Sequence, residues 1–184
     1  MTAEGTTSAS VPYTITIVGI QDIDLQLPQV VGLLESCFPQ EADGEEAPQE
    51  HSVDSICGLY DPQCTIWVLA RASESPSAPL VGLAFLAPTH NGLFLANLCV
   101  LPSLRSSGIG TALLRAAEAE AMNRGHEYIV GTVDLSNVRG MSLYERLGAE
   151  RVEGMALAGG GARPTAVRLR AKVGVGREGE EKRT

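Results

Sequence analysis

The stretch of sequence that decides the fold reads Leu98-Cys99-Val100-Leu101-Pro102-Ser103-Leu104-Arg105-Ser106-Ser107-Gly108-Ile109-Gly110-Thr111. Its apolar first residues predict a strand that stops at Pro102, and a turn of the form Arg-x-x-Gly-x-Gly then opens directly into a helix predicted over 111–123. Such a turn directs several backbone N–H groups and the positive end of a helix dipole at one point, which favours a phosphate group. We therefore expect a phosphorylated ligand at this turn.

Two common nucleotide-binding patterns do not match the turn. A Walker P-loop requires Gly-Lys-Ser/Thr at its end, but Gly110 is followed by Thr-Ala. A dinucleotide fingerprint requires a third glycine where Leu113 stands. A strand-to-helix turn that uses its glycines for structural reasons alone stays open on these residues.

The rest of the chain alternates short apolar runs with amphipathic segments. In the helix after the turn, an apolar stripe from Ile109 to Ala121 predicts the buried side, and Arg115 and Glu118 are expected on the opposite face. Strands are predicted over 13–18, 65–70, 80–86, 93–100, 128–133, 151–157 and 165–173, and further helices over 23–38 and 138–147.

This order of elements predicts an α+β fold with a mixed, mostly antiparallel central sheet of about seven strands flanked by helices, because one strand–helix–strand crossover interrupts a series of hairpins. We assign residues 12–173 to one domain, residues 1–11 to a flexible N-terminal tail and residues 174–184 to a charged C-terminal tail. A length of 184 residues suits a single core.

Composition excludes several classes of partner. A formal net charge of −8 argues against nucleic acid and favours a cationic partner such as an amine. The apolar runs are shorter than the roughly 18 residues that a membrane-spanning helix needs, so no membrane partner is expected. The first residues lack the basic and apolar regions of a secretory signal, which leaves a cytoplasmic or nuclear location. The four cysteines form no C-x-x-C pair, so we expect buried free thiols and no metal site.

Two motifs in the right order resemble the GNAT superfamily of acyl-CoA-dependent N-acetyltransferases. The family signature Val-x-Pro-x-x-Arg/Gln-x-x-Gly-x-Gly/Ala corresponds to Val100-Leu-Pro-Ser-Leu-Arg-Ser-Ser-Gly-Ile-Gly110, and the second motif to Asn137-Val-Arg-Gly-Met-Ser-Leu-Tyr144-Glu-Arg-Leu-Gly148. The resemblance implies splayed fourth and fifth strands, acetyl-CoA as co-substrate, and an amine acceptor that is a small molecule or a protein. The oligomeric state is left between monomer and homodimer.

The resemblance also implies roles for individual residues. The exposed strand edge at Leu98, Cys99 and Val100 would bind the pantetheine arm as an added strand, with Asn137 on its other side. Tyr144 would act as general acid for the departing CoA thiolate. The pyrophosphate would lie on the backbone amides of the turn, which are those of Arg105, Ser106, Ser107, Gly108, Ile109, Gly110 and Thr111.

Structural alternatives stay open for three of these residues. Asn137 directly precedes a predicted helix and suits an N-cap, a role compatible with ligand binding. Tyr144 lies on an apolar helical stripe and suits core packing. Arg105 suits a solvated side chain whose amide alone binds the ligand.

The general base and the acceptor are not assigned by the sequence. In members that acetylate protein N-termini, a Glu commonly stands five residues before the motif Asn, where this chain has Thr132. Asp134, His90 and Asn97 are the nearest polar candidates, and none of them carries the role. The acidic stretch 41–50 suits either attraction of a cationic acceptor or a solvated loop.

The chain departs from the family motif at one further position. Ala149 stands where the family often has Phe after the final Leu-Gly, which affects packing and not cofactor binding.

An acyl-CoA-binding regulatory module without turnover is the alternative function, and a purely structural domain is a third.

Overall fold

The structure is a computed structural model that describes residues 12–18, 23, 26–38, 65–89, 92–152 and 164–170, the last range by its backbone alone. Both predicted tails, the acidic stretch 41–50, His90 and the cysteines at 57 and 64 lie outside the described residues, as do parts of the predicted last hairpin. The extent of the domain therefore stays a prediction.

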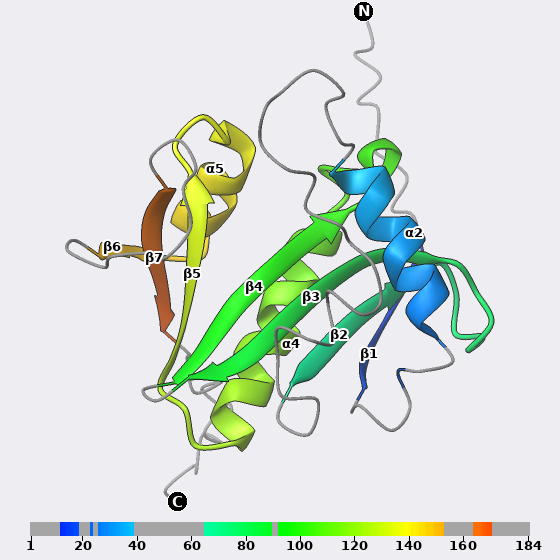
Figure 1. Ribbon diagram of the computed structural model, residues 1–184, viewed down its shortest axis with the longest axis horizontal. Helices are drawn as coiled ribbons and strands as arrows, with labels where there is room; N and C mark the ends of the chain where they lie inside the picture. Colours follow the sequence, from blue (N-terminus) through cyan, green and yellow to red (C-terminus); the bar gives the residue numbers. More distant parts are fainter. Residues whose placement is uncertain are drawn as a thin grey trace, which may run out of the picture.

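The chain forms a mixed sheet with helices on both faces (Figure 1), and this confirms the predicted α+β class. The strands follow the order β1-β2-β3-β4-β5-β7-β6, and every neighbouring pair is antiparallel except β4 and β5. The elements are β1 (Thr14–Val18), α2 (Leu27–Cys37), β2 (Ile66–Arg71), β3 (Leu80–Thr89), β4 (Gly92–Val100), the 3-10 turn η2 (Pro102–Leu104), α4 (Ile109–Asn123), β5 (Tyr128–Asp134), α5 (Val138–Arg146), β6 (Glu150–Val152) and β7 (Pro164–Arg170).

Two hydrophobic clusters hold these layers together. The first lies between the sheet and helices α4 and α5, and the second lies under α2 on the opposite face. In Figure 1, α2 accordingly crosses in front of the sheet and α4 lies behind it. The predicted apolar stripe of α4 is buried, from Ile109 at 1% exposure to Ala121 at 0%. The helix begins at Ile109 and not at Thr111, because Gly108 already serves as its N-cap.

The prediction that Glu118 lies on the face of α4 opposite the buried stripe, away from the core, is wrong. Its side chain is buried, with Oε2 accepting a 2.7 Å hydrogen bond from the Arg115 guanidinium, while Oε1 has no partner among the described residues. The reason is the width of the sheet: α4 contacts β1 through β5, so the sheet covers the flanks of the helix as well as its apolar stripe.

The fourth and fifth strands diverge, as the resemblance implies. They pair only from Leu93 opposite Ile129 to Leu95 opposite Gly131, and beyond that point each continues without the other. A register shift against β3 at the same level leaves Ala96 without a partner. An extra residue of this kind bends a strand, so the bulge lies where β4 turns away from β5. The resulting gap opens toward the start of α4.

Gly82 of β3 lets α4 approach the sheet at this end. A Cβ at Gly82 would lie 3.0 Å from the Cys99 carbonyl oxygen and within 3.2 Å of side-chain atoms of Leu113 and Ile109. A side chain at this position would press on these atoms, so glycine lets the first turns of α4 pack directly on β3 and β4. The packing at Gly82 thus helps to place the helix N-terminus beside the end of β4.

Candidate functional site

The turn between β4 and α4 presents a row of free backbone donors. The first amide of the helix to find an intrahelical acceptor is that of Ala112, which donates to the Gly108 carbonyl at 3.0 Å, and the amides of residues 106–111 make no hydrogen bond to another described residue. Ser106 and Gly108 are in the left-handed region, with φ of 66° and 91°, and Ser107 between them has a negative φ. When successive residues alternate between right-handed and left-handed conformations, their N–H groups point to the same side. The backbone then forms a concavity that binds anions.

Arg105 departs from the expected role of its amide. The amide donates a long hydrogen bond, 3.4 Å, to the Pro102 carbonyl and so belongs to the turn. The side chain is exposed, yet it is not merely solvated, because its Nε donates to the Val100 carbonyl at 3.2 Å. Ser107 fixes the turn further, since its hydroxyl donates to the Leu104 carbonyl at 2.6 Å. The guanidinium of Arg105 is thereby held between the strand end and the free amides.

The open edge of β4 offers only every second residue to a ligand. The amide of Leu101 donates to Val81 of β3, and backbone groups in an antiparallel strand point alternately to either side. The backbone groups of Cys99 therefore face β3, whereas those of Leu98 and Val100 face the gap. The Val100 carbonyl already accepts a hydrogen bond from Arg105. The groups left free at this edge are therefore the amide and the carbonyl of Leu98 and the amide of Val100.

Asn137 is the N-cap of α5, which confirms the alternative that the sequence left open. Its Oδ1 accepts a hydrogen bond from the Gly140 amide at 2.9 Å. A Cβ at Gly140 would lie only 2.8 Å from Asn137 Nδ2, so the glycine lets the Asn137 side chain fold over the first turn of the helix. The cap uses the oxygen of the amide, and the Nδ2 donor stays available to a ligand because the residue is exposed.

Tyr144 combines a packed ring with a protonated hydroxyl. The residue is 6% exposed and belongs to the core cluster with Met141 and Leu147, so the packing alternative is also correct. Burial raises the pKa of Tyr144 to about 12. Its hydroxyl makes no hydrogen bond within the described residues. The phenol is therefore neutral at physiological pH, and its proton is not committed to another described group.

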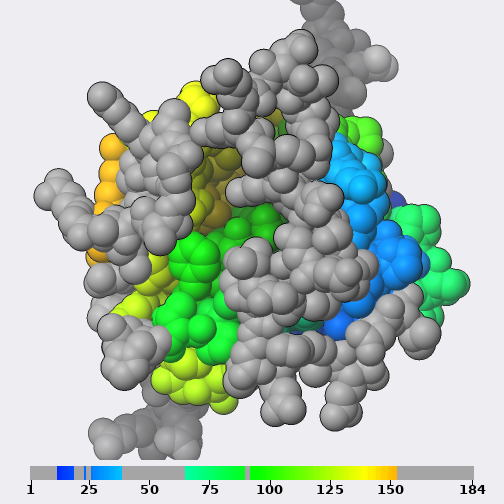
Figure 2. All heavy atoms as spheres, viewed as in Figure 1, coloured from blue at the N-terminus to red at the C-terminus, as the bar shows by residue number. Residues whose placement is uncertain are grey.

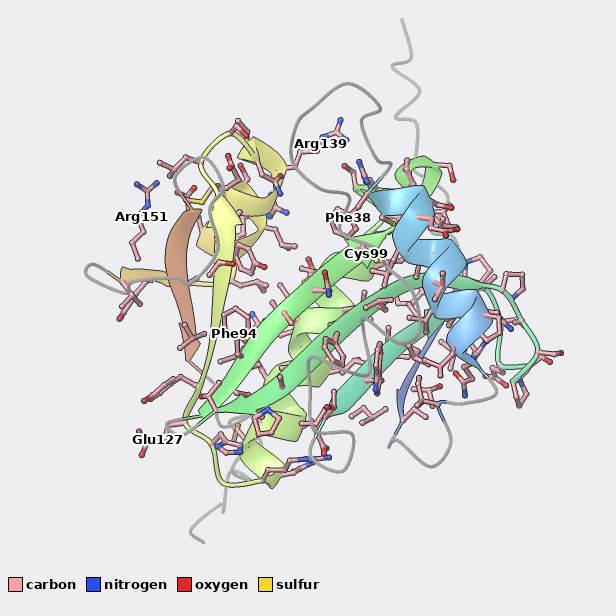
Figure 3. All side chains as sticks on the ribbon, in the orientation of Figure 1. Phe38, Phe94, Cys99, Glu127, Arg139 and Arg151 are labelled. Carbon is pink, nitrogen blue, oxygen red and sulfur yellow. The ribbon has the colours of Figure 1, made fainter. Side chains whose placement is uncertain are left out.

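Helix α5 packs against the start of α4, which brings the two sequence motifs together. A Cβ at Gly110 would lie 3.4 Å from a methyl carbon of Leu143, the residue before Tyr144. In Figure 2, green atoms of β4 reach the surface between the blue α2 and the yellow atoms of β5 and α5. Figure 3 shows Arg139 extending from the start of α5 toward this opening. The sequence alone did not single out Arg139, Gly82 or Gly140, since none lies at a defining position of either motif.

None of the three described candidates, Asp134, Asn97 and Thr132, suits the role of general base. The Asp134 carboxylate accepts a 2.7 Å hydrogen bond from the Ser136 amide, and hydrogen bonding to Ser136 lowers the pKa of Asp134, which makes it a weaker base. The amide of Asn97 and the hydroxyl of Thr132, both half-buried, are not bases at neutral pH.

No group of three His, Cys, Asp or Glu side chains in the described part of the chain could hold a metal ion. None of the helices described is both long and apolar enough to cross a bilayer.

Comparisons with known proteins agree on one family. A sequence model described as the acetyltransferase (GNAT) family matches residues 27–149. The ribosomal-protein-S18-alanine N-acetyltransferase of Escherichia coli superposes with a TM-score of 0.64 at 17% identity, covering 94% of this chain and 100% of that one. A GNAT-family acetyltransferase of Staphylococcus aureus gives 0.66 at 14% identity, covering 86% and 100%. The PaiA N-acetyltransferase of Thermoplasma acidophilum, in complex with coenzyme A, gives 0.61 at 17% identity, covering 85% and 99%.

Proposed function

The chain belongs to the GNAT acetyltransferase family and is an acyltransferase, and on this premise we propose that it transfers an acetyl group from acetyl-CoA to a primary amine. The amine, carried by a small molecule or a protein, attacks the thioester carbonyl directly in a ternary complex. No covalent enzyme intermediate forms. The cytoplasmic or nuclear location stays a prediction from the sequence.

The observation that carries this proposal is the row of free amides at residues 106–111, which opens onto the unpaired edge of β4. These amides would hold the pyrophosphate, because the helix N-terminus and the turn place several donors around one anion. The pantetheine arm would lie along the gap, bonded by Leu98 and the Val100 amide as an added strand. Asn137 Nδ2 would donate from the opposite side, and Arg139 would add a positive charge at the opening.

Tyr144 would supply the proton that the leaving group needs. As the tetrahedral adduct collapses, the carbon–sulfur bond breaks and the sulfur takes a proton from the neutral phenol. A pKa of about 12 keeps Tyr144 protonated at neutral pH, so the acid form is ready before each turnover. The amine loses its own proton to a base that lies outside the residues assigned here.

The experiment that tests the proposal measures binding and turnover separately. Isothermal titration with acetyl-CoA should show saturable binding, and a panel of amines and peptides should include acceptors that release free CoA thiol. Absence of binding at millimolar acetyl-CoA would contradict the cofactor assignment. Binding without transfer to any acceptor in the panel would contradict the enzymatic function and favour a regulatory module that only binds the cofactor.

A further inference from the structure

A tyrosine side chain reaches the turn from the side of the sheet that lies away from the gap. Tyr13 directly precedes β1, which forms the edge of the sheet opposite β6. A Cβ built on Gly108, the N-cap of α4, would lie 4.0 Å from the Tyr13 hydroxyl oxygen. No other atom of a described residue would lie as close to it. A residue from the far edge of the sheet thus places a hydroxyl beside the free amides.

The register of the strands explains why Tyr13 comes to this place. The start of β1 pairs with the end of β2, that end pairs with the start of β3, and the start of β3 pairs with the end of β4. The residue before β1 therefore lies at the same end of the sheet as the turn. The Tyr13 ring packs against the cluster between the sheet and α4, which directs the side chain toward the start of that helix.

The Tyr13 hydroxyl is not committed to another described residue. No hydrogen bond joins it to any of them, the residue is half-buried, and Gly108 beside it is exposed. Two carbonyls of the turn already accept hydrogen bonds, that of Gly108 from the Ala112 amide and that of Leu104 from the Ser107 hydroxyl. The packed ring therefore presents a free donor whose position is set before any ligand binds.

The hydroxyl and the turn are close enough to hold one anion together. Bond lengths place the Tyr13 oxygen within about 6.5 Å of the Gly108 nitrogen, because a Cβ lies about 2.5 Å from the nitrogen of its own residue. Two hydrogen bonds of about 2.7 and 2.9 Å to different oxygens of one phosphate can span up to about 8 Å. A single phosphate group can therefore accept from both donors.

We propose that the Tyr13 hydroxyl binds the cofactor by donating a hydrogen bond to a phosphate oxygen of acetyl-CoA, an inference that rests on the proposed function. The free amides would hold the phosphate from the backbone, and Tyr13 would hold it from the side away from the gap. Tyrosine suits this position because its hydroxyl donates one hydrogen bond, and hydrogen bonds to a charged oxygen are stronger than neutral ones.

The test compares Tyr13→Phe with the unmodified chain by isothermal titration. The substitution keeps the packed ring and removes only the hydroxyl, so the thermal unfolding curve should not change. The Kd for acetyl-CoA should rise about tenfold, the typical loss for a hydrogen bond to a charged group. Tyr128→Phe is the matched control, because Tyr128 contacts Gly92 at the start of β4, at the other end of the sheet. Its Kd for acetyl-CoA should equal that of the unmodified chain.

Two shortened ligands identify the phosphate. S-acetylpantetheine carries no phosphate, so Tyr13→Phe should bind it as the unmodified chain does. A hydrogen bond to the pyrophosphate predicts that the tenfold loss persists with acetyl-3′-dephospho-CoA, whereas a hydrogen bond to the 3′-phosphate predicts that it disappears. An unchanged Kd for acetyl-CoA in Tyr13→Phe, or an equal loss with S-acetylpantetheine, would overturn the proposal.

Failure of the proposed function gives a different result. If the unmodified chain does not bind acetyl-CoA, the cofactor assignment is wrong, and inorganic pyrophosphate becomes the probe. A shift of the Gly108 amide resonance that saturates at lower pyrophosphate concentration in the unmodified chain than in Tyr13→Phe would support Tyr13 as an anion ligand at the turn. Equal titration curves for the two proteins, or no shift in either, would overturn that role as well.

Discussion

The turn at residues 105–111 and the face of the sheet under α2 adjoin the same gap, yet they are built by different means. The turn offers backbone donors whose direction is set by two left-handed residues and a helix start. The α2 face offers side chains, with Trp67, Phe85 and Asn97 side by side across three strands. Trp67 and Phe85 have ring centroids 4.2 Å apart, and the buried indole N–H of Trp67 has no partner among the described residues.

Under the proposed function, the turn would bind the cofactor and the α2 face would select the acceptor. A backbone site depends on conformation, so it needs glycine and a helix at fixed spacing and tolerates varied side chains around them. A side-chain site changes whenever one residue changes. We therefore expect substitutions in the turn and in α5 to alter acetyl-CoA binding or chemistry, and substitutions on the α2 face to alter the acceptor.

The largest expected effect is on turnover in Tyr144→Phe. Removing the hydroxyl should lower kcat about 100-fold, the low end of what a general acid contributes, and leave the Kd for acetyl-CoA within about twofold. Because the pKa of Tyr144 is about 12, its deprotonation should not reduce kcat between pH 7 and pH 9. Steady-state kinetics with calorimetry would measure both quantities. Met141→Leu, a buried change on the same helix, is the control, and equal kcat in both variants would remove the general-acid role.

The next effect is on cofactor affinity in Gly108→Ala. A side chain at a φ of 91° is strained, so the turn should relax and misdirect its amides, raising the Kd for acetyl-CoA about tenfold. Gly125→Ala is the matched control, because Gly125 has a φ of 79° at the far end of α4 and open space around its Cβ. Both variants should lose thermal stability, but only Gly108→Ala should lose affinity. A similar Kd in the two variants would show that the direction of the amides does not matter.

A smaller effect is expected on the acceptor side in Asn97→Ala. Asn97 lies opposite Phe85 on the face that α2 covers, next to the point where β4 leaves β5. Loss of one hydrogen bond, worth about 1 kcal/mol, should raise the KM for the amine a fewfold and leave the Kd for acetyl-CoA unchanged. The measurement is steady-state kinetics with the best acceptor from the panel. A change in acetyl-CoA affinity alone would place Asn97 in the cofactor site and would contradict a separate acceptor site on the α2 face.

The smallest effect on function, though not on stability, is expected in Gly82→Ala. The new Cβ would press on the Cys99 carbonyl oxygen and on two side chains of α4, which should cost about 1–3 kcal/mol of unfolding free energy. Gly32→Ala is the control with the opposite sign, because Gly32 lies inside α2 with nothing within 4 Å of its Cβ, and alanine there should stabilise the helix by about 0.5–1 kcal/mol. Denaturant unfolding measures both, and a neutral Gly82→Ala would show that α4 does not need this close approach.

The sequence predicted the backbone features of the site well and the side-chain features less well. Hydrophobic periodicity placed the strands and helices, and the glycines of the turn located the free amides. The roles of Asn137 and Tyr144 as cap and core residues also followed from their positions on a helix. Periodicity could not show that Glu118 is buried, because that depends on how many strands α4 crosses.

Other features required the tertiary structure. The need for glycine at Gly82 appears only when α4 is packed on β3, and the burial of Cys37 and Cys99 in one cluster appears only when α2 is folded over β4. Likewise, the alternation of backbone groups, and not the motif, decides that Leu98 and Val100 face the gap whereas Cys99 faces β3. The acceptor is undetermined for the same reason, since side chains from distant segments would select it.

Amide NMR can show whether the amides of residues 106–111 receive the anionic part of acetyl-CoA. Titration with acetyl-CoA should shift the backbone amide resonances of Gly108, Gly110 and Thr111 most strongly, together with that of Leu98 at the edge of β4. The amide of Gly125, at the other end of the same helix, should barely move. Saturable binding that leaves the amide resonances of the turn unshifted, or shifts confined to another part of the sheet, would contradict binding of the anion at the turn.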